Sequence, residues 1–321
     1  MKFVGVPIKR LEDPRLLVGG GRFVDDVVRP GMVHAVVVRS PHAHARVRRV
    51  DPRRALALPG VVACVTGADL ADVPTIPLRQ GARPEHTGYL QPPLARDTVR
   101  YGGEPVAVVV AADRATAVDA RELVEIDYDV LPALVDPADA ERPGGPILFP
   151  GGNVVDSWTT ALGDVDTVLR DAACVVRERF SVGRQTAAPM ETRGLVAEWD
   201  AVASRLTVWG TTKVPYFNRQ ALGTMLELDE ARIHFVESDA GGGFGARGEF
   251  YPEDFLVPFL ARRLERPVKW IEDRREHFLT INHSREQQWS VAAAADARGK
   301  LLALDATLIN VLSDYLRTHS I

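Results

Sequence analysis

The chain has 321 residues, of which 46% are hydrophobic and 26% are charged, and its formal net charge is −4. This length accommodates two ordinary domains with a globular balance of residue types. The slightly negative charge provides no basic field for a nucleic acid, and no apolar run approaches the roughly 18 to 20 residues of a membrane helix.

The first half of the chain is predicted to be rich in strands. Asp113 is a predicted N-cap for one helix that passes through Ala115, Val118 and Leu123. A polar loop with several prolines is expected between Ile76 and Asp97. The strands predicted here cover residues 32–40, 61–70 (running into a turn), 106–111 and 124–128.

The stretch ERPGGPILFPGGN, residues 141–153, is dense in proline and glycine and is the best linker candidate in the chain. We therefore predict a first domain over residues 1–145 and a second over residues 154–321.

The N-terminal stretch MKFVGVPIKRLEDPRL lacks the apolar core of a signal peptide. Cys64 and Cys174 form no CxxC pair and cannot by themselves hold an iron–sulfur cluster. Together these features predict a cytoplasmic protein.

Strands and helices are both predicted in the second half, so the expected fold class is α+β. One helix is predicted to begin near Tyr216, and a second is predicted over residues 250–264. DRREH, residues 273–277, is interpreted as a solvated turn and helix start. WSVAAAAD and KLLALDATLINVL form a closing strand pair around the turn ADARGK. The other predicted strands cover residues 174–183, 193–200, 205–213, 232–238 and 267–273.

The segment DAGGGFGARGE, residues 239–249, lies between a predicted strand and a predicted helix, a geometry suited to binding a phosphate. Gly243, Gly245 and Gly248 satisfy the pattern GxGxxG. Glu272 and Asp273 end the next strand, roughly where a ribose-binding acid belongs. A nicotinamide dinucleotide-binding protein is therefore one alternative, and a glycine turn without a ligand is another.

Phe244 interrupts that fingerprint and suggests a ring packed against a flat ligand. No Walker lysine follows the glycines, which argues against a nucleotide triphosphatase. His42 and His44 share one face of an extended segment, but no third ligand is near, so no metal site is predicted there.

A wider pattern extends beyond this loop. GGGFGARGEFYPED, preceded by TTKVPYFNRQAL and RQTAAPMETRG, resembles the molybdenum-binding subunit of the xanthine dehydrogenase, aldehyde oxidase and carbon monoxide dehydrogenase family. In the first half, VGVPIKRLEDPRLLVGGGRFVDD, VRSPHAHARV, LPGVVACVTGADL and RYGGEPVAVVVAADRATAVDARELVEIDYDVLPALVDP resemble that family's α/β hammerhead domain. The resemblance covers nearly the whole chain and implies a hammerhead domain followed by the first part of a molybdopterin-binding domain.

The resemblance implies a molybdenum-dependent oxidoreductase, incomplete as this single chain. Such hydroxylases insert a water-derived oxygen into a C–H bond of an aldehyde or N-heterocycle, or oxidise carbon monoxide. The implied cofactor is molybdopterin with molybdenum, in bacteria usually the cytosine dinucleotide form. The implied partners are the remaining part of the molybdenum subunit, an FAD-binding medium subunit and a small subunit with [2Fe–2S] clusters.

In the family, the loop that matches Gly242, Gly243, Phe244 and Gly245 lies against the cofactor, so these residues are expected to bind it. Backbone N–H groups can donate to oxo and pterin oxygens without adding charge, and the Phe244 ring is expected to flank the substrate channel. Met190–Arg193 matches a family segment near the cofactor, with a simple acid–base pair at a strand edge as the alternative.

Four positions raise questions about the site. Lys213 stands where the family usually has a glutamine near a molybdenum oxo ligand, and it either tunes the metal or pairs with a carboxylate. Xanthine-oxidising members carry a glutamate where this chain has Gly248, so purine specificity is unsupported. Glu249 is expected to contact substrate or to charge the first turn of its helix. Arg247 is expected to meet a phosphate or substrate carboxylate, or to be an exposed helix-start arginine.

The family's subunit continues past the point equivalent to Ile321, and that continuation carries the glutamate base that activates metal-bound water. No general base and no metal ligand are therefore assigned in this chain. We expect a fragment, a split gene product or one chain of a composite site, with apolar surface exposed where the rest packs. A non-catalytic assembly module of the same fold is the alternative.

Overall fold

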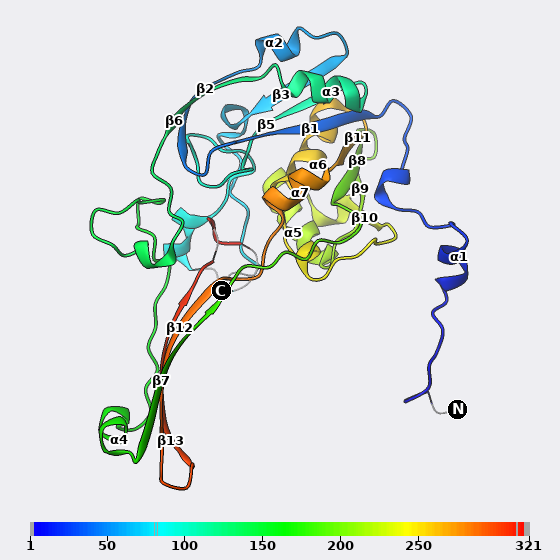
Figure 1. Ribbon diagram of the computed structural model, residues 1–321. Helices are drawn as coiled ribbons and strands as arrows, with labels where there is room; N and C mark the ends of the chain where they lie inside the picture. Colours follow the sequence, from blue (N-terminus) through cyan, green and yellow to red (C-terminus); the bar gives the residue numbers. More distant parts are fainter. Residues whose placement is uncertain (1–2, 80, 82, 313, 318–321) are drawn as a thin grey trace.

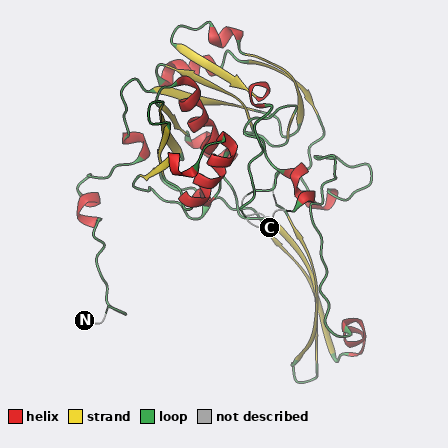
Figure 2. Cartoon of the chain, turned by 180° about the vertical axis from the view of Figure 1, so that it is seen from behind, coloured by secondary structure: helices red, strands yellow, loops and turns green. Residues whose placement is uncertain are grey.

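The computed structural model describes residues 3–79, 81, 83–312 and 314–317. It contains a body built on a central sheet, a small sheet beside it, and a long three-stranded arm that projects from the body (Figures 1 and 2). The mixture of helices with mainly antiparallel sheets confirms the α+β prediction. Within the described residues, no helix combines the length and apolar character needed to cross a bilayer.

The central sheet has seven strands in the order β10-β9-β8-β11-β1-β5-β3. Strand β1 pairs in parallel with β11, with Val33 beside Val268, and pairs antiparallel with β5. Strands from before and after residues 141–153 therefore share one hydrogen-bonded sheet, and the domain division at that stretch stays a prediction. The strands are β1 (Val33–Arg39), β3 (Val61–Thr66), β5 (Pro105–Ala111), β8 (Gly194–Asp200), β9 (Arg205–Gly210), β10 (Ile233–Glu237) and β11 (Val268–Ile271).

Buried apolar runs explain the centre of this sheet. Every residue of β5 is buried, as expected for a strand covered on both faces. Helix α6 (Pro252–Leu264) packs Phe255 and Leu260 against the sheet and into the main core. The predicted N-cap is confirmed, because the Asp113 side chain accepts a hydrogen bond from the N–H of Thr116 at the start of α3. The other helices are α1 (Asp13–Leu17), α2 (Arg53–Leu56), α3 (Arg114–Arg121), α4 (Val165–Asp171), α5 (Pro215–Leu226) and α7 (Arg274–Thr280).

The small sheet has the order β4-β2-β6 and includes a strand that the sequence did not reveal. Strand β2 reads ARVRRVD, and its charges hide the apolar alternation that marks a strand. The structure explains the charges, because Arg49 Nε lies 2.9 Å from Asp127 on β6 and Arg48 pairs with Asp129. Cross-strand ion pairs of this kind support a sheet with one exposed face. The strands are β2 (Ala45–Asp51), β4 (Thr98–Val99) and β6 (Glu125–Val130).

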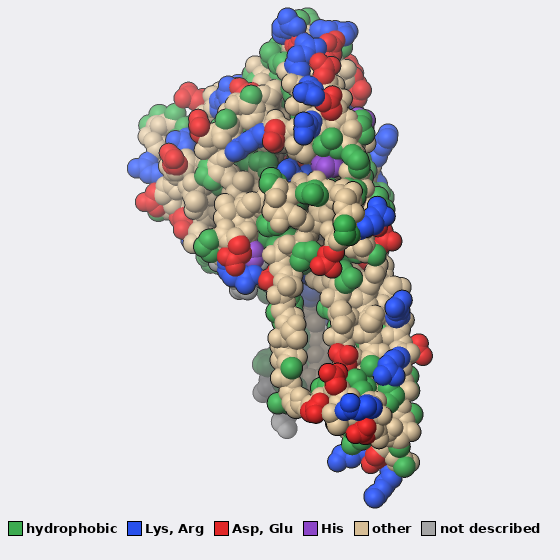
Figure 3. Space-filling view, turned by 90° about the vertical axis from the view of Figure 1, so that its left-hand side faces the viewer, with side chains coloured by type: hydrophobic (Ala, Val, Ile, Leu, Met, Phe, Trp, Pro, Cys, Tyr) green, Lys and Arg blue, Asp and Glu red, His purple; other side chains and the backbone are tan. Residues whose placement is uncertain are grey.

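The arm is an antiparallel sheet in the order β13-β12-β7, formed by β7 (Cys174–Val182), β12 (Gln287–Ala295) and β13 (Leu301–Asn310). This confirms the predicted closing strand pair. Helix α4 packs on β12 and β13, and Ala294 of β12 is fully buried. In the space-filling view the arm extends below the body, and hydrophobic and charged side chains mix at its lower end (Figure 3). Most of its surface is thus unpartnered within the described chain.

Short 3₁₀ turns join these elements. One of them changes the predicted geometry of the glycine segment, because residues 246–248 form a separate turn and α6 begins only at Pro252, not at Phe250. The turns are η1 (Val24–Asp26), η2 (Gly67–Leu70), η3 (Pro84–Tyr89), η4 (Pro137–Asp139), η5 (Glu230–Arg232) and η6 (Ala246–Gly248).

Candidate functional site

The glycine segment, defined here as residues 239–249, lies between the end of β10 and the start of α6. Gly242 and Gly245 have φ angles of 106° and 92°, and Phe244 also has a positive φ of 46°. A Cβ on Gly241 would lie 2.3 Å from the Cβ of Glu191. The segment therefore needs glycine both for its left-handed turns and for its close approach to the chain around Glu191.

The geometry of a dinucleotide-binding turn is not formed here. The glycines lead into the short turn η6, so the N-terminus of α6 at Pro252 lies beyond them. Strand β11 is separated from β10 by β9 and β8. Glu272, the acid proposed for a ribose, is buried and bonded to Arg193 and His277. These observations count against the nicotinamide alternative.

Arg247 braces the glycine segment from inside the protein. Its Nε donates to the Gly242 carbonyl at 2.8 Å, and its Nη2 lies 2.8 Å from Glu191 Oε2. The same Glu191 oxygen accepts the N–H of Gly241 at 2.8 Å. Burial lowers the pKa of the Arg247 guanidinium, and Glu191 opposes that shift. The expectation of an exposed helix-start arginine is wrong, since Arg247 is buried; its contact with a phosphate or substrate stays a prediction.

A network of buried ion pairs lies beside the contacts of Arg247 with Gly242 and Glu191. Arg193 Nη2 lies 2.5 Å from Glu272 Oε1, and Arg193 Nη1 lies 3.1 Å from Glu253 Oε2. Burial by itself would raise the pKa of Glu272, but Arg193 and a hydrogen bond from His277 hold it well below its ordinary value. The Arg193 guanidinium also sits 3.9 Å from the centre of the Tyr251 ring. Thus the Met190–Arg193 segment supplies two partners, the partly buried Glu191 to the loop and the buried Arg193 to the core.

Two predictions about neighbouring residues need correction. The segment DRREH does start a helix, α7, with Asp273 as its N-cap, but His277 is fully buried against Glu272 and is not solvated. Glu249 lies outside the first turn of α6, so it does not charge that turn. It is instead buried. Burial of Arg317 alone would lower the pKa of that guanidinium, but Tyr101, Tyr251 and Glu249 together raise it above its ordinary value.

An open cleft of about 430 Å³ lies on the outer side of the glycine segment. The Lys213 N–H donates to the Arg247 carbonyl at 3.0 Å, which holds the lysine segment beside the loop. The Phe244 side chain is 78% exposed. Four predicted site residues therefore meet around this cleft, namely Lys213, Phe244, Gly245 and Glu249. Its other polar lining residues are Arg184, Gln185, Thr186, Asn282, His283, Ser284 and Arg285, which the sequence did not single out.

The other two predicted glycines face the protein. An added Cβ would lie 3.0 Å from Pro189 at Gly242 and 3.8 Å from Arg247 at Gly243. The backbone N–H groups on either side of Gly242–Gly245 are used internally, by Glu191 at Gly241 and by the η6 turn at Ala246. The two N–H groups that flank these four residues are therefore already used within the protein.

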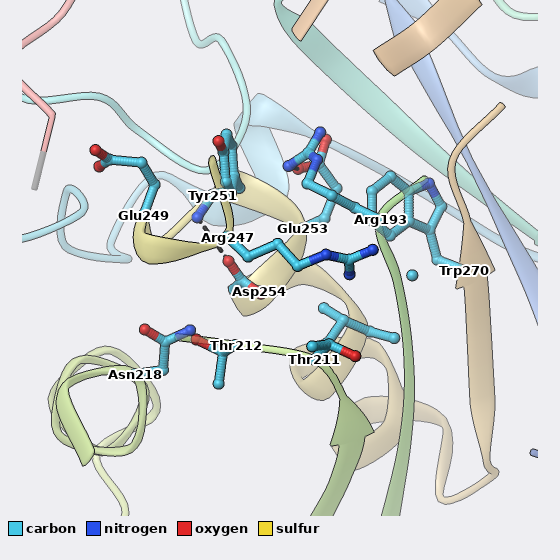
Figure 4. A pocket seen from close by; sticks show the side chains of 12 residues that line it. Arg193, Thr211, Thr212, Asn218, Arg247, Glu249, Tyr251, Glu253, Asp254 and Trp270 are labelled. Atoms are coloured by element: carbon cyan, nitrogen blue, oxygen red, sulfur yellow. Dashed lines mark hydrogen bonds and ion pairs between the residues drawn. The ribbon is translucent and has the colours of Figure 1, made fainter. Parts of the chain in front are cut away.

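A second, much smaller cavity lies behind the loop. It measures about 20 Å³, and Figure 4 shows Arg247, Asn218 and Asp254 around it. Asn218 Oδ1 has no hydrogen-bond partner among the described residues. This volume fits one water molecule and no substrate. The outer cleft is the candidate ligand site, because four of the predicted site residues line it.

The two histidines near β2 have ordinary structural contacts. His44 Nδ1 lies 2.7 Å from the carbonyl oxygen of Pro132, and His42 packs edge-on against Tyr128. In the described part of the chain, no group of three or more His, Cys, Asp or Glu residues is arranged to hold a metal ion.

Comparison with known proteins places both halves of the chain. Residues 18–132 match the aldehyde oxidase and xanthine dehydrogenase a/b hammerhead domain, and residues 148–321 match the molybdopterin cofactor-binding domain. The nicotine 6-hydroxylase large subunit of Paenarthrobacter nicotinovorans is 38% identical over 93% of this chain and 37% of its own length. The carbon monoxide dehydrogenase large chain of Afipia carboxidovorans is 37% identical over 97% of this chain and 39% of its own length.

The fold agrees with solved structures over nearly its whole length. Quinoline 2-oxidoreductase from Pseudomonas putida 86 superposes with a TM-score of 0.94 at 38% identity, covering 99% of this chain and 41% of that one. The chain thus spans about two fifths of the relatives it matches. By its two domain matches and its fold, the chain belongs to the molybdenum-binding subunit family of xanthine dehydrogenase, aldehyde oxidase and carbon monoxide dehydrogenase.

Proposed function

We propose that this chain forms one wall of the molybdopterin site of a cytoplasmic molybdenum hydroxylase. The observation that carries the proposal is the two-sided glycine segment: Arg247 and Glu191 fasten its inner side, while Phe244 and Gly245 line the outer cleft. Relatives named as a nicotine hydroxylase and carbon monoxide dehydrogenases support this class of reaction. The expected substrate is an aldehyde, an N-heterocycle or carbon monoxide.

The cleft fits such a cofactor chemically. Its lining includes the cationic side chains of Arg184, Lys213 and Arg285 and the carboxylate of Glu249. Phosphate groups and metal oxo groups favour cationic and N–H donors, and a flat pterin suits an exposed aromatic ring. When bound, the molybdopterin would supply the oxidation chemistry. The cytosine dinucleotide form is part of the proposal.

Two residues that line the cleft, Phe244 and Lys213, then have specific roles. Phe244 would exclude water from one side of the substrate channel. Lys213 would donate a hydrogen bond where relatives usually place a neutral amide, and its extra charge would stabilise anionic groups nearby. We place the general base in the remaining part of the subunit. Electrons would leave through [2Fe–2S] clusters and FAD on partner chains.

Exposed apolar side chains on the arm support the proposal that this chain is only part of the large subunit. Residues that face each other across its strands lie on the same side of the sheet, which groups Val176 with Leu304 and Phe180 with Leu308. Val176, Phe180 and Leu304 are 52%, 57% and 56% exposed. Because the relatives are more than twice as long as the matched stretch, we propose that the remaining part of the large subunit covers this face.

The alternative is a non-catalytic assembly module of the same fold, and the observation that favours it is Lys213 at the usual glutamine position. To separate the two, the chain would be isolated from its native host with its bound proteins. Mass spectrometry would identify those proteins, and elemental analysis would quantify molybdenum and iron. Molybdenum together with flavin and iron–sulfur partners supports the enzyme. A chain isolated without molybdenum would overturn it.

A further inference from the structure

The glycine segment is also held from outside, by the N-terminal segment. Asp239, the first residue of the glycine segment, forms a two-pronged ion pair with Arg15. Arg15 Nη1 lies 2.6 Å from Asp239 Oδ2, and Arg15 Nη2 lies 2.8 Å from Oδ1. These residues are 224 positions apart in the chain. Such paired N–H···O contacts fix orientation as well as distance.

Backbone contacts complete this attachment. The N–H of Arg22 donates to Asp239 Oδ2 at 2.7 Å, and the N–H of Asp239 donates to the Arg22 carbonyl at 2.9 Å. Arg15 Nη1 also donates to the Gly20 carbonyl at 2.9 Å, which folds the segment back on itself. A Cβ on Gly20 would lie 2.9 Å from Arg15 Cγ, so glycine permits this close turn. We call the contacts of Arg15 and Arg22 with Asp239 the clasp.

We propose that the clasp positions the glycine segment for the cofactor, with Asp239 as the positioning residue. This inference rests on the proposed function. Within the four residues 242–245, Gly242, Phe244 and Gly245 have positive φ angles. Phe244 is strained in this conformation because it carries a Cβ. Strained backbone persists only when the surrounding structure holds it in place. Arg247 and Glu191 hold one side of it, and the clasp holds its start.

The clasp is expected to act locally. The side chains of Arg15 and Asp239 are 46% and 22% exposed, so the pair contributes little to global stability. Its effect should appear as local opening of residues 240–249, which hydrogen exchange resolves. A change in the overall unfolding temperature is not expected.

The test measures hydrogen exchange in the protein isolated from its host with its partners bound. Asp239→Asn keeps an acceptor oxygen for the Arg22 N–H but removes the charge, and Arg15→Gln removes the other partner. Each variant should speed exchange in residues 240–249 by about two- to fivefold. The double variant should add little to either single one, because both break the same pair. Arg10→Gln is the matched control, since Arg10 pairs with Asp13 in the same N-terminal segment.

Salt provides a readout that a general structural defect would not reproduce. At about 1 M salt, where the screening length falls to about 3 Å, exchange in the wild-type segment should rise toward that of Asp239→Asn. The variant itself should respond little. Unchanged exchange in Asp239→Asn and Arg15→Gln would overturn the clasp whatever the molybdenum content.

Molybdenum content separates this inference from the proposed function. Faster exchange with reduced molybdenum content and an altered Mo(V) electron paramagnetic resonance signal supports both. Faster exchange with full molybdenum content and an unaltered signal would show that the clasp orders a segment that does not hold the cofactor. In that case its proposed positioning role and the cofactor role of the glycine segment would both be rejected.

Discussion

At the scale of single residues, the glycine segment depends on a charge pair between the buried Arg247 and the partly buried Glu191. Glu191→Gln should destabilise the protein by about 3 kcal/mol, because it leaves the Arg247 guanidinium buried without its counter-charge. Urea unfolding would measure this change. Arg54→Gln, which breaks an exposed pair with Glu125, should cost less than about 1 kcal/mol. Equal losses of unfolding free energy in the two variants would contradict a stabilising role for the Arg247–Glu191 pair.

Substitution of Phe244 is expected to affect activity much more than stability. Phe244→Gly should change the free energy of unfolding by less than about 1 kcal/mol, since relief of the positive-φ strain offsets the greater freedom of the unfolded chain. The ring is mostly exposed, so little packing is lost. If the ring flanks the substrate channel, kcat/KM of the assembled enzyme should fall by about tenfold or more. A large loss of stability would instead show that the ring packs inside the protein.

At the scale of elements, the C-terminal segment docks beside β5 through a buried carboxyl group. The Glu104 carboxyl accepts a hydrogen bond of 2.6 Å from the Tyr315 hydroxyl and another of 2.6 Å from the N–H of Arg100. Burial raises the pKa of Glu104 from its ordinary value of 4.5 to about 7, although both hydrogen bonds oppose the shift. The folded protein therefore binds this proton more tightly than the unfolded chain does.

A pH dependence of stability follows from that shift. Between about pH 4.5 and pH 7 the folded state holds more protons at Glu104, so the free energy of unfolding should decrease as pH rises through this window. Glu104→Gln should flatten the slope, by an amount on the order of 3 kcal/mol across the window. Chemical unfolding of both proteins at several pH values measures the difference. Parallel pH profiles would reject the assignment to Glu104.

Prediction from sequence worked best where an element is apolar and worst where charge covers it. The run of valines in β5 and the capped helix α3 are visible as patterns. Strand β2 was missed because its arginines mask the apolar alternation, and Arg48 and Arg49 pair with aspartates on β6, far along the chain. The start of α6 was placed too early because the glycines close a separate turn before it.

At the scale of the whole molecule, the arm makes a prediction about assembly. Phe180→Ser should leave the stability of the chain nearly unchanged, because the side chain is more than half exposed. It should weaken association with the remaining part of the subunit by about tenfold, as loss of a buried aromatic contact does. Arg179→Ser is the matched control, since adjacent strand residues point to opposite faces. A pull-down with quantitative mass spectrometry compares them, and equal recovery would place the partner elsewhere.

The sequence by itself determined most strands and helices, the glycine segment and the family, because local periodicity, turn residues and ordered motifs are written along the chain. Only the tertiary structure decided that strands from both halves form one sheet. It also decided that Arg247 faces Glu191 rather than the outer cleft, and that Asp239 meets Arg15. The reason is physical: partners separated by 56 and 224 residues are brought together by packing of the whole core, which no local pattern encodes.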